Sequence, residues 1–166
     1  MRRRLIVDSN RCTGCEACVD VCTMQNNRII DPSRSRLWIS KDEAKAVFVP
    51  FICQQCESAP CERACPVGAI TRHPETQAYV VDRELCNGCK MCVWACPFSV
   101  IRIDDEGKCA KCEYCGGVPA CAIVCAPGAL KWGDIDDPEN IIHWDFADRR
   151  SRAEERARVL LEESGP

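Results

Sequence analysis

The sequence has no long apolar segment, no excess of basic charge, and few aromatic or histidine side chains. No run approaches the ~20 apolar residues of a membrane helix, so we expect no direct membrane insertion. A formal net charge of −3, from 22 basic and 25 acidic residues, disfavours nucleic acid as a partner. There is no GxGxxG motif, no P-loop, and no pair of carboxylates beside a histidine. The sequence therefore predicts no catalytic site of its own.

Cysteine is the residue type in large excess, with 17 in 166 residues. A disulfide scaffold, structural zinc or iron–sulfur clusters could each explain this number. The chain begins Met-Arg-Arg-Arg, but Asp8, Asn10 and Arg11 leave no room for the apolar region of a secretory leader. We therefore expect a cytoplasmic protein, in which thiols stay reduced and free to bind metal.

The cysteines form four motifs with two alternating spacings. The first and third follow CxxCxxCxxxC; the second and fourth have a CxxC and a CxxxC separated by four or five residues. A CxxCxxC loop can hold three irons of one cubane, while the last cysteine, beyond a short helical turn, ligates the other cluster of a two-cluster unit. Zinc would need two separated CxxC pairs around one ion, so the spacing favours clusters.

Local patterns predict short strands and one- or two-turn helices. Gly14 and Gly88 lie inside cysteine loops, where positive φ lets backbone N–H groups approach the sulfides. Pro66, Pro97 and Pro127 follow the last cysteines of their motifs and should end the short helices. Expected strands cover residues 5–8, 36–40, 46–50, 78–82, 100–104 and 129–132, and expected helices include residues 16–21 and 91–95.

Residues 5–132 resemble the four-cluster ferredoxin subunits of molybdenum- and tungsten-pterin oxidoreductases, which are related to carbon monoxide dehydrogenase and hydrogenase iron–sulfur subunits. The resemblance rests on CTGCEACVDVC, CQQCESAPCERACPVGAI, CNGCKMCVWACPFSVI and KCEYCGGVPACAIVCAPGAL. Short loops make the chain most similar to the small subunits of tungsten-dependent aldehyde oxidoreductases. Two departures are Thr23, where a proline often follows the first motif, and Ala126, which separates Cys125 from Pro127.

The resemblance implies an α+β fold of two dicluster ferredoxin units, one nested inside the other in sequence. Residues 1–30 and 105–133 would form the outer unit, residues 46–104 the inner unit, and residues 134–166 a linker and helix. It also implies four [4Fe–4S] clusters in a chain, with motif one paired to motif four and motif two to motif three. The implied ligands are Cys12, Cys15, Cys18 and Cys125 for cluster 1; Cys22, Cys112, Cys115 and Cys121 for cluster 2; Cys53, Cys56, Cys61 and Cys96 for cluster 3; and Cys65, Cys86, Cys89 and Cys92 for cluster 4.

These features predict a polyferredoxin subunit that relays single electrons. The resemblance implies a catalytic subunit as partner, with a tungsten- or molybdenum-pterin and aldehyde-oxidising activity, and a flavoprotein subunit or ferredoxin as acceptor. A carbon monoxide dehydrogenase, hydrogenase or formate dehydrogenase partner, a free-standing polyferredoxin, and a zinc-binding module are the alternatives.

Several residues have competing interpretations. Cys109 could join Cys112 and Cys115 in a CxxCxxC, but the pattern of the second motif makes it a spare thiol, with a ligand or redox-sensing role as the alternative. His73 and His143 could bind a cluster, yet sixteen cysteines already satisfy four cubanes. The tryptophans are expected to exclude water and fill a thin core rather than carry electrons; they are Trp38, Trp94, Trp132 and Trp144.

The tail after a turn-like Asp-Asp-Pro is predicted to be an amphipathic helix over residues 146–163. Its apolar stripe could cover the chain's own core, or dock on a catalytic subunit or on a second copy, giving self-association end to end. The stripe consists of Phe146, Ala153, Ala157, Leu160 and Leu161.

Overall fold

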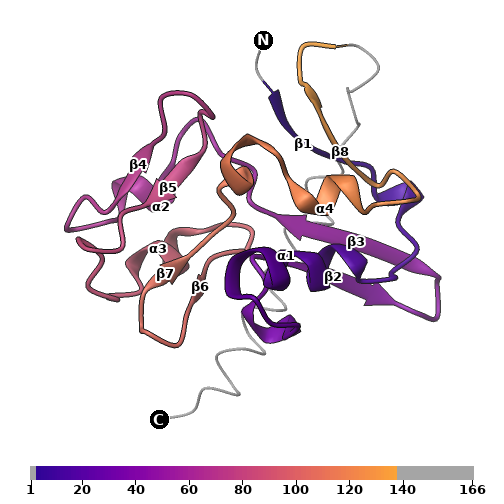
Figure 1. Cartoon of the computed structure of the whole chain (residues 1–166), viewed down its shortest axis with the longest axis horizontal. Helices are drawn as coiled ribbons and strands as arrows, with labels where there is room; N and C mark the ends of the chain where they lie inside the picture. Colours follow the sequence, from indigo (N-terminus) through magenta and orange to yellow (C-terminus); the bar gives the residue numbers. More distant parts are fainter. Residues whose placement is uncertain (1–2, 138–166) are drawn as a thin grey trace.

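Short strands and short helices alternate along residues 3–137, the part of the chain that the computed structural model describes (Figure 1). The α-helices are α1 (Ala17–Asn27), α2 (Pro60–Arg63), α3 (Met91–Ala95) and α4 (Ala120–Ile123). The strands are β1 (Arg3–Val7), β2 (Leu37–Asp42), β3 (Val47–Ile52), β4 (Ile70–Arg72), β5 (Tyr79–Val81), β6 (Arg102–Ile103), β7 (Cys109–Ala110) and β8 (Leu130–Asp134). Three 3-10 helices complete the described part: η1 (Ser9–Arg11), η2 (Pro32–Arg34) and η3 (Tyr114–Gly117).

Helix α1 is longer than predicted, and Thr23 explains why. The other three helices have four or five residues, whereas α1 has 11. Where a proline would remove a backbone donor, Thr23 continues the helix. Its buried hydroxyl donates to the Asp20 carbonyl at 2.8 Å and accepts from the Asp31 amide at 3.3 Å. Thr23, which departs from the family pattern, thus lengthens α1 and anchors the loop that follows it.

The six predicted strands all overlap observed ones, but β4 and β7 were missed. They have three and two residues, the same lengths as their partners β5 and β6, which the sequence did predict. All four pairings within residues 3–137 are antiparallel and two-stranded, in the orders β1–β8, β2–β3, β4–β5 and β6–β7. The described part is a small α+β fold, as the sequence predicts.

Strand pairing joins the two ends of the described segment. Strand β1 pairs with β8, placing Leu5 opposite Trp132, and α1 packs against α4. The middle of the chain pairs within itself, since β4 pairs with β5 and α2 packs against α3. Figure 1 shows these as two groups, with β4, β5, α2 and α3 to the left of β1, β8, α1 and α4. Strands β6 and β7 pair across residues 104 and 105, where we expected the boundary between units.

The hairpin β2–β3 contributes to two core clusters through alternate side chains. Leu37 and Ile52 lie opposite each other and pack in the cluster that contains residues of β1, α1 and β8. The next pair, Trp38 and Phe51, stacks with ring centroids 4.1 Å apart in a separate cluster with Val100. Neighbouring residues of a strand point to opposite faces, so this hairpin contributes to both clusters.

The tryptophan prediction is confirmed for Trp38 and wrong for Trp94. Trp38 is 7% exposed, whereas Trp94 is 67% exposed. The five-residue helix α3 turns Cys92 inward, and a helix this short cannot bury the opposite side as well.

Trp144, His143 and the predicted helix over residues 146–163 lie outside the described residues. None of the helices in residues 3–137 is both long enough and apolar enough to span a membrane.

Candidate metal centres

The sixteen motif cysteines line four cavities of similar size, with empty volumes of about 310 to 340 Å³. Each cavity takes three cysteines from one motif and one from another. We number the cavities site 1 to site 4, and they contain the four sets that the resemblance implies. Site 1 is lined by Cys12, Cys15, Cys18 and Cys125; site 2 by Cys22, Cys112, Cys115 and Cys121; site 3 by Cys53, Cys56, Cys61 and Cys96; and site 4 by Cys65, Cys86, Cys89 and Cys92.

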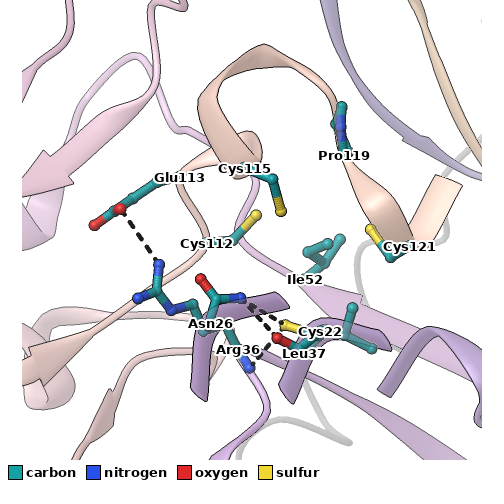
Figure 2. Close-up of a pocket in the computed structure, with 10 residues that line it drawn as sticks. All are labelled: Cys22, Asn26, Arg36, Leu37, Ile52, Cys112, Glu113, Cys115, Pro119 and Cys121. Carbon is teal, nitrogen blue, oxygen red and sulfur yellow. Dashed lines mark hydrogen bonds and ion pairs between the residues drawn. The ribbon is translucent and has the colours of Figure 1, made fainter. Parts of the chain in front are cut away.

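Figure 2 shows site 2, where four sulfur atoms from three segments of the chain face a common space. Leu37, Ile52 and Pro119 supply apolar walls. The Cys22 sulfur accepts two hydrogen bonds, from the Arg36 amide at 3.4 Å and from Asn26 Nδ2 at 3.6 Å. At the rim, Arg36 forms an ion pair with Glu113 at 3.3 Å. Donors directed at a sulfur stabilise negative charge on a metal-bound thiolate.

Short helices place neighbouring sites side by side. Helix α1 contributes Cys18 to site 1 and Cys22 to site 2, and residues four apart lie about 6 Å along a helix axis. Helix α3 does the same for sites 4 and 3, with Cys92 inside the helix and Cys96 as its C-cap. Each CxxxC therefore reaches two adjacent cavities.

The cysteine loops turn through left-handed backbone conformations. Gly14 and Gly88 have φ of +70° and +73°, and the residues that precede α1 and α3, Glu16 and Lys90, have φ of 61° and 64°. A Cβ at Gly88 would stand 2.2 Å from the Gly107 carbonyl oxygen, so only glycine fits there. The prediction that Gly14 and Gly88 have positive φ is therefore confirmed.

The thiols of one site raise each other's pKa, which fits a cationic centre between them. Burial and then the charges of Cys12, Cys125 and Cys15 raise the pKa of Cys18 to about 12. In site 2, burial and then Cys112, Cys22 and Cys115 raise the pKa of Cys121. Four thiolates in an apolar cavity repel one another unless positive metal stands among them, so the donor set fits an iron–sulfur cubane. Within residues 3–137, no group of three or more histidine, cysteine or acidic side chains is arranged to hold a single ion.

Exposure distinguishes sites 1 and 4 from sites 2 and 3. Cys15 of site 1 and Cys89 of site 4 are exposed, whereas every cysteine of sites 2 and 3 is buried or half-buried. Sites 2 and 3 are neighbours, because the Gln55 side chain, from the loop of site 3, donates to the Cys112 carbonyl of site 2 at 2.7 Å.

Cys109 lies at site 4, whereas His73 lies away from all four sites. Cys109 is buried and lines the cavity of site 4 as a fifth cysteine, with its sulfur 3.5 Å from Cys92 Sγ and its amide donating to Cys86 Sγ at 3.4 Å. The hydrogen bond between the Cys92 and Cys109 sulfurs is the main cause that lowers the pKa of Cys92 to about 7. His73 lines none of the four cavities, and its Nδ1 accepts the amides of Glu75 and Thr76 in a turn.

Comparison with known families identifies iron–sulfur domains in the chain. A family described as the 4Fe–4S dicluster domain matches residues 44–135, and a 4Fe–4S binding domain matches residues 5–24. The chain belongs to the 4Fe–4S dicluster family. It therefore contains 4Fe–4S cluster-binding domains and is a ferredoxin-like iron–sulfur protein.

Proteins similar to this chain include named subunits of oxidoreductases. The thiosulfate reductase electron transfer subunit PhsB of Salmonella typhi is 38% identical over 149 residues, covering 81% of this chain and 77% of the relative. Protein NrfC of Escherichia coli is 35% identical over 158 residues, covering 86% and 70%. The polyferredoxin-like subunit of the aliphatic sulfonate oxidoreductase of Pyrococcus furiosus is 36% identical over 122 residues, covering 73% and 70%.

Two residues beside the sites were not singled out by the sequence. Lys111 and Gln55 are buried polar residues between sites 2 and 3. Each lies next to a motif cysteine, which was the only signal available, because their burial depends on contacts between distant parts of the chain.

Proposed function

We propose that the chain is an electron-transfer subunit that holds four [4Fe–4S] clusters, one in each of sites 1 to 4. The single observation that carries the proposal is the division of sixteen cysteines into four sets of four, each around a cavity of about the same volume. The ligands are those sixteen residues, grouped as the cavities group them. This grouping makes two dicluster units, with sites 1 and 2 in the outer unit and sites 3 and 4 in the inner unit.

The arrangement supports an unbranched path through the protein. Helices α1 and α4 each contain, or are directly followed by, cysteines of both site 1 and site 2. Helices α2 and α3 do the same for sites 3 and 4. The contact between Gln55 and the Cys112 carbonyl joins the two pairs. Because the exposed cysteines belong to sites 1 and 4, electrons would enter at one end and leave at the other.

The residues of the chain hold the centres and set their potentials. When bound, each cubane supplies a one-electron couple whose ligands do not change. Backbone amides of Leu130, Ala69 and Cys109 donate to Cys125, Cys65 and Cys86 at 3.2 to 3.4 Å. Such N–H to sulfur bonds stabilise negative charge on the thiolates, so they favour the reduced state.

The partner we propose is the catalytic subunit of an oxidoreductase, and no catalysis is assigned to this chain. Relatives named as electron-transfer or polyferredoxin-like subunits support that role. The sequence resemblance favours a tungsten- or molybdenum-pterin subunit that oxidises aldehydes, with a flavoprotein or ferredoxin as the acceptor. We place the chain in the cytoplasm, in keeping with its unpaired cysteines.

Metal analysis of anaerobically purified protein tests the cluster proposal. We expect about sixteen irons and about sixteen acid-labile sulfides per chain, because each four-thiolate set holds one cubane. About eight irons, or stoichiometric zinc, would contradict it.

Isolation of the native complex through a tag on this chain tests the partner. Tungsten or molybdenum in a co-purified subunit that reduces this chain with an aldehyde is the expected result. Nickel in the co-purified subunit would assign the chain to a carbon monoxide dehydrogenase or hydrogenase instead, and purification without any partner would favour a free-standing polyferredoxin.

A further inference from the structure

Lys111 is the one charged residue that is buried within residues 3–137, and it lies between sites 2 and 3. Its relative exposure is 0%, and only Thr23, Ser35 and Gln55 are other buried polar residues in that part of the chain. Burying a charge is costly unless polar groups and opposite charge compensate for it. The surroundings of Lys111 therefore need an explanation beyond packing.

All three partners of Lys111 Nζ are acceptors. The ammonium donates to the Tyr79 carbonyl, to the Cys112 carbonyl at 3.1 Å and to Gln55 Oε1 at 3.5 Å. A lysine has three N–H donors only when it is protonated, so this environment suits the charged form. The Tyr79 ring adds a cation–π contact, with Nζ 6.0 Å from its centroid.

Those partners come from both central sites. Gln55 and Tyr79 line the cavity of site 3, and Cys112 lines that of site 2. Gln55 fixes the position, because its Oε1 also accepts from the Tyr79 amide at 2.8 Å while its Nε2 donates to the Cys112 carbonyl. The charge is thus held at the junction between the two pairs of sites.

We infer that Lys111 is a potential-setting residue, whose ammonium makes the clusters of sites 2 and 3 easier to reduce than a neutral side chain would. A cubane with four thiolates is anionic and gains one more negative charge on reduction. A fixed positive charge nearby therefore stabilises the reduced form more than the oxidised form. This inference rests on the proposed function, since it concerns bound clusters, and it makes the junction between the two units a favourable place for an electron.

The effect is measurable as a change in the one-electron reduction equilibrium. A unit charge roughly 10 Å away, at an effective dielectric constant of about 20, shifts such an equilibrium about tenfold. A tenfold change corresponds to about 59 mV for a one-electron couple. We expect Lys111→Met to lower the midpoint potentials of two of the four clusters by about this amount and to change the other two less.

The assay is an anaerobic redox titration followed by low-temperature EPR, on the full chain with its clusters. Lys45→Met is the matched control, because Lys45 is 77% exposed and pairs with Asp42 on the surface; it should leave all four potentials unchanged. Gln55→Glu is the second variant. It keeps Lys111 but adds a negative charge beside Nζ, so it should lower the same two potentials.

Iron content decides how the titrations are interpreted. If the wild-type chain holds no reducible clusters, the proposed function fails. If it titrates as four clusters and both Lys111→Met and Gln55→Glu retain iron with unchanged potentials, only the role of Lys111 is refuted. If neither variant retains its iron, Lys111 serves folding rather than potential, and the inference is likewise overturned.

Discussion

Replacing Gly88 by alanine should selectively damage site 4. Gly88 lies between Cys86 and Cys89 with φ of +73°, and a Cβ there would be 2.2 Å from the Gly107 carbonyl oxygen. Contacts below 3.0 Å are essentially not found for real Cβ atoms, so one of the two loops must move by about 0.8 Å. We expect Gly88→Ala to lose about four irons out of about sixteen, because one cubane is released.

The turn that contains Gly107 resists this movement. The Gly107 amide donates to the Asp104 carbonyl at 2.9 Å, and Asp104 Oδ1 accepts the amides of Glu106 and Lys108 at 3.0 and 2.9 Å. The left-handed conformation costs a non-glycine residue about 1–2 kcal/mol, and overpacking adds about 1–3 kcal/mol. The total of about 2–5 kcal/mol is a large part of the about 5–15 kcal/mol that stabilises an ordinary domain.

Gly68→Ala is the control for backbone conformation alone. Gly68 has φ of +63°, but no atom lies within 4 Å of the position that a Cβ would take there, so this variant carries the conformational cost without the clash. We would measure iron per chain and thermal unfolding of anaerobic holoprotein for both variants. The reasoning is refuted if Gly88→Ala keeps its iron and unfolds at the same temperature as Gly68→Ala.

Three further predictions concern ligation and packing. Cys12→Ser and Cys22→Ser should abolish different EPR signals, because these residues line sites 1 and 2; identical losses would mean that each motif closes on its own cluster. Cys109→Ala should keep the full iron content, since site 4 already has four other cysteines; a loss of about four irons would make Cys109 a ligand. Thr23→Val should lower the free energy of unfolding by about 1–2 kcal/mol in chemical denaturation, because the Asp31 amide and the buried position lose a hydrogen-bonding group; an unchanged midpoint would show that α1 does not need this contact.

Local spacing was enough to predict the chemistry of the chain. The three thiols of a CxxCxxC loop lie too close together to bind metal at separate places, so this spacing indicates a single cubane. The glycines of these loops, at 14 and 88, and the short helix over residues 91–95 follow from similarly local rules. The sequence alone showed that Thr23 departs from the family pattern. Its consequence, an 11-residue α1 that is hydrogen-bonded to Asp31, became visible only in the structure.

Tertiary structure decided what surrounds the cysteines. Gln55 and the Cys112 carbonyl meet across 57 positions of sequence, and Cys109 reaches Cys92 across 17, so no spacing rule could place these contacts. Trp94 is exposed for the same reason, because the side of α3 that packs depends on where α2 lies. The sequence by itself determined which metal groups this protein is suited to hold. The fold determined how those sites adjoin and placed one buried charge between the central pair, since burial is a property of the whole packed chain.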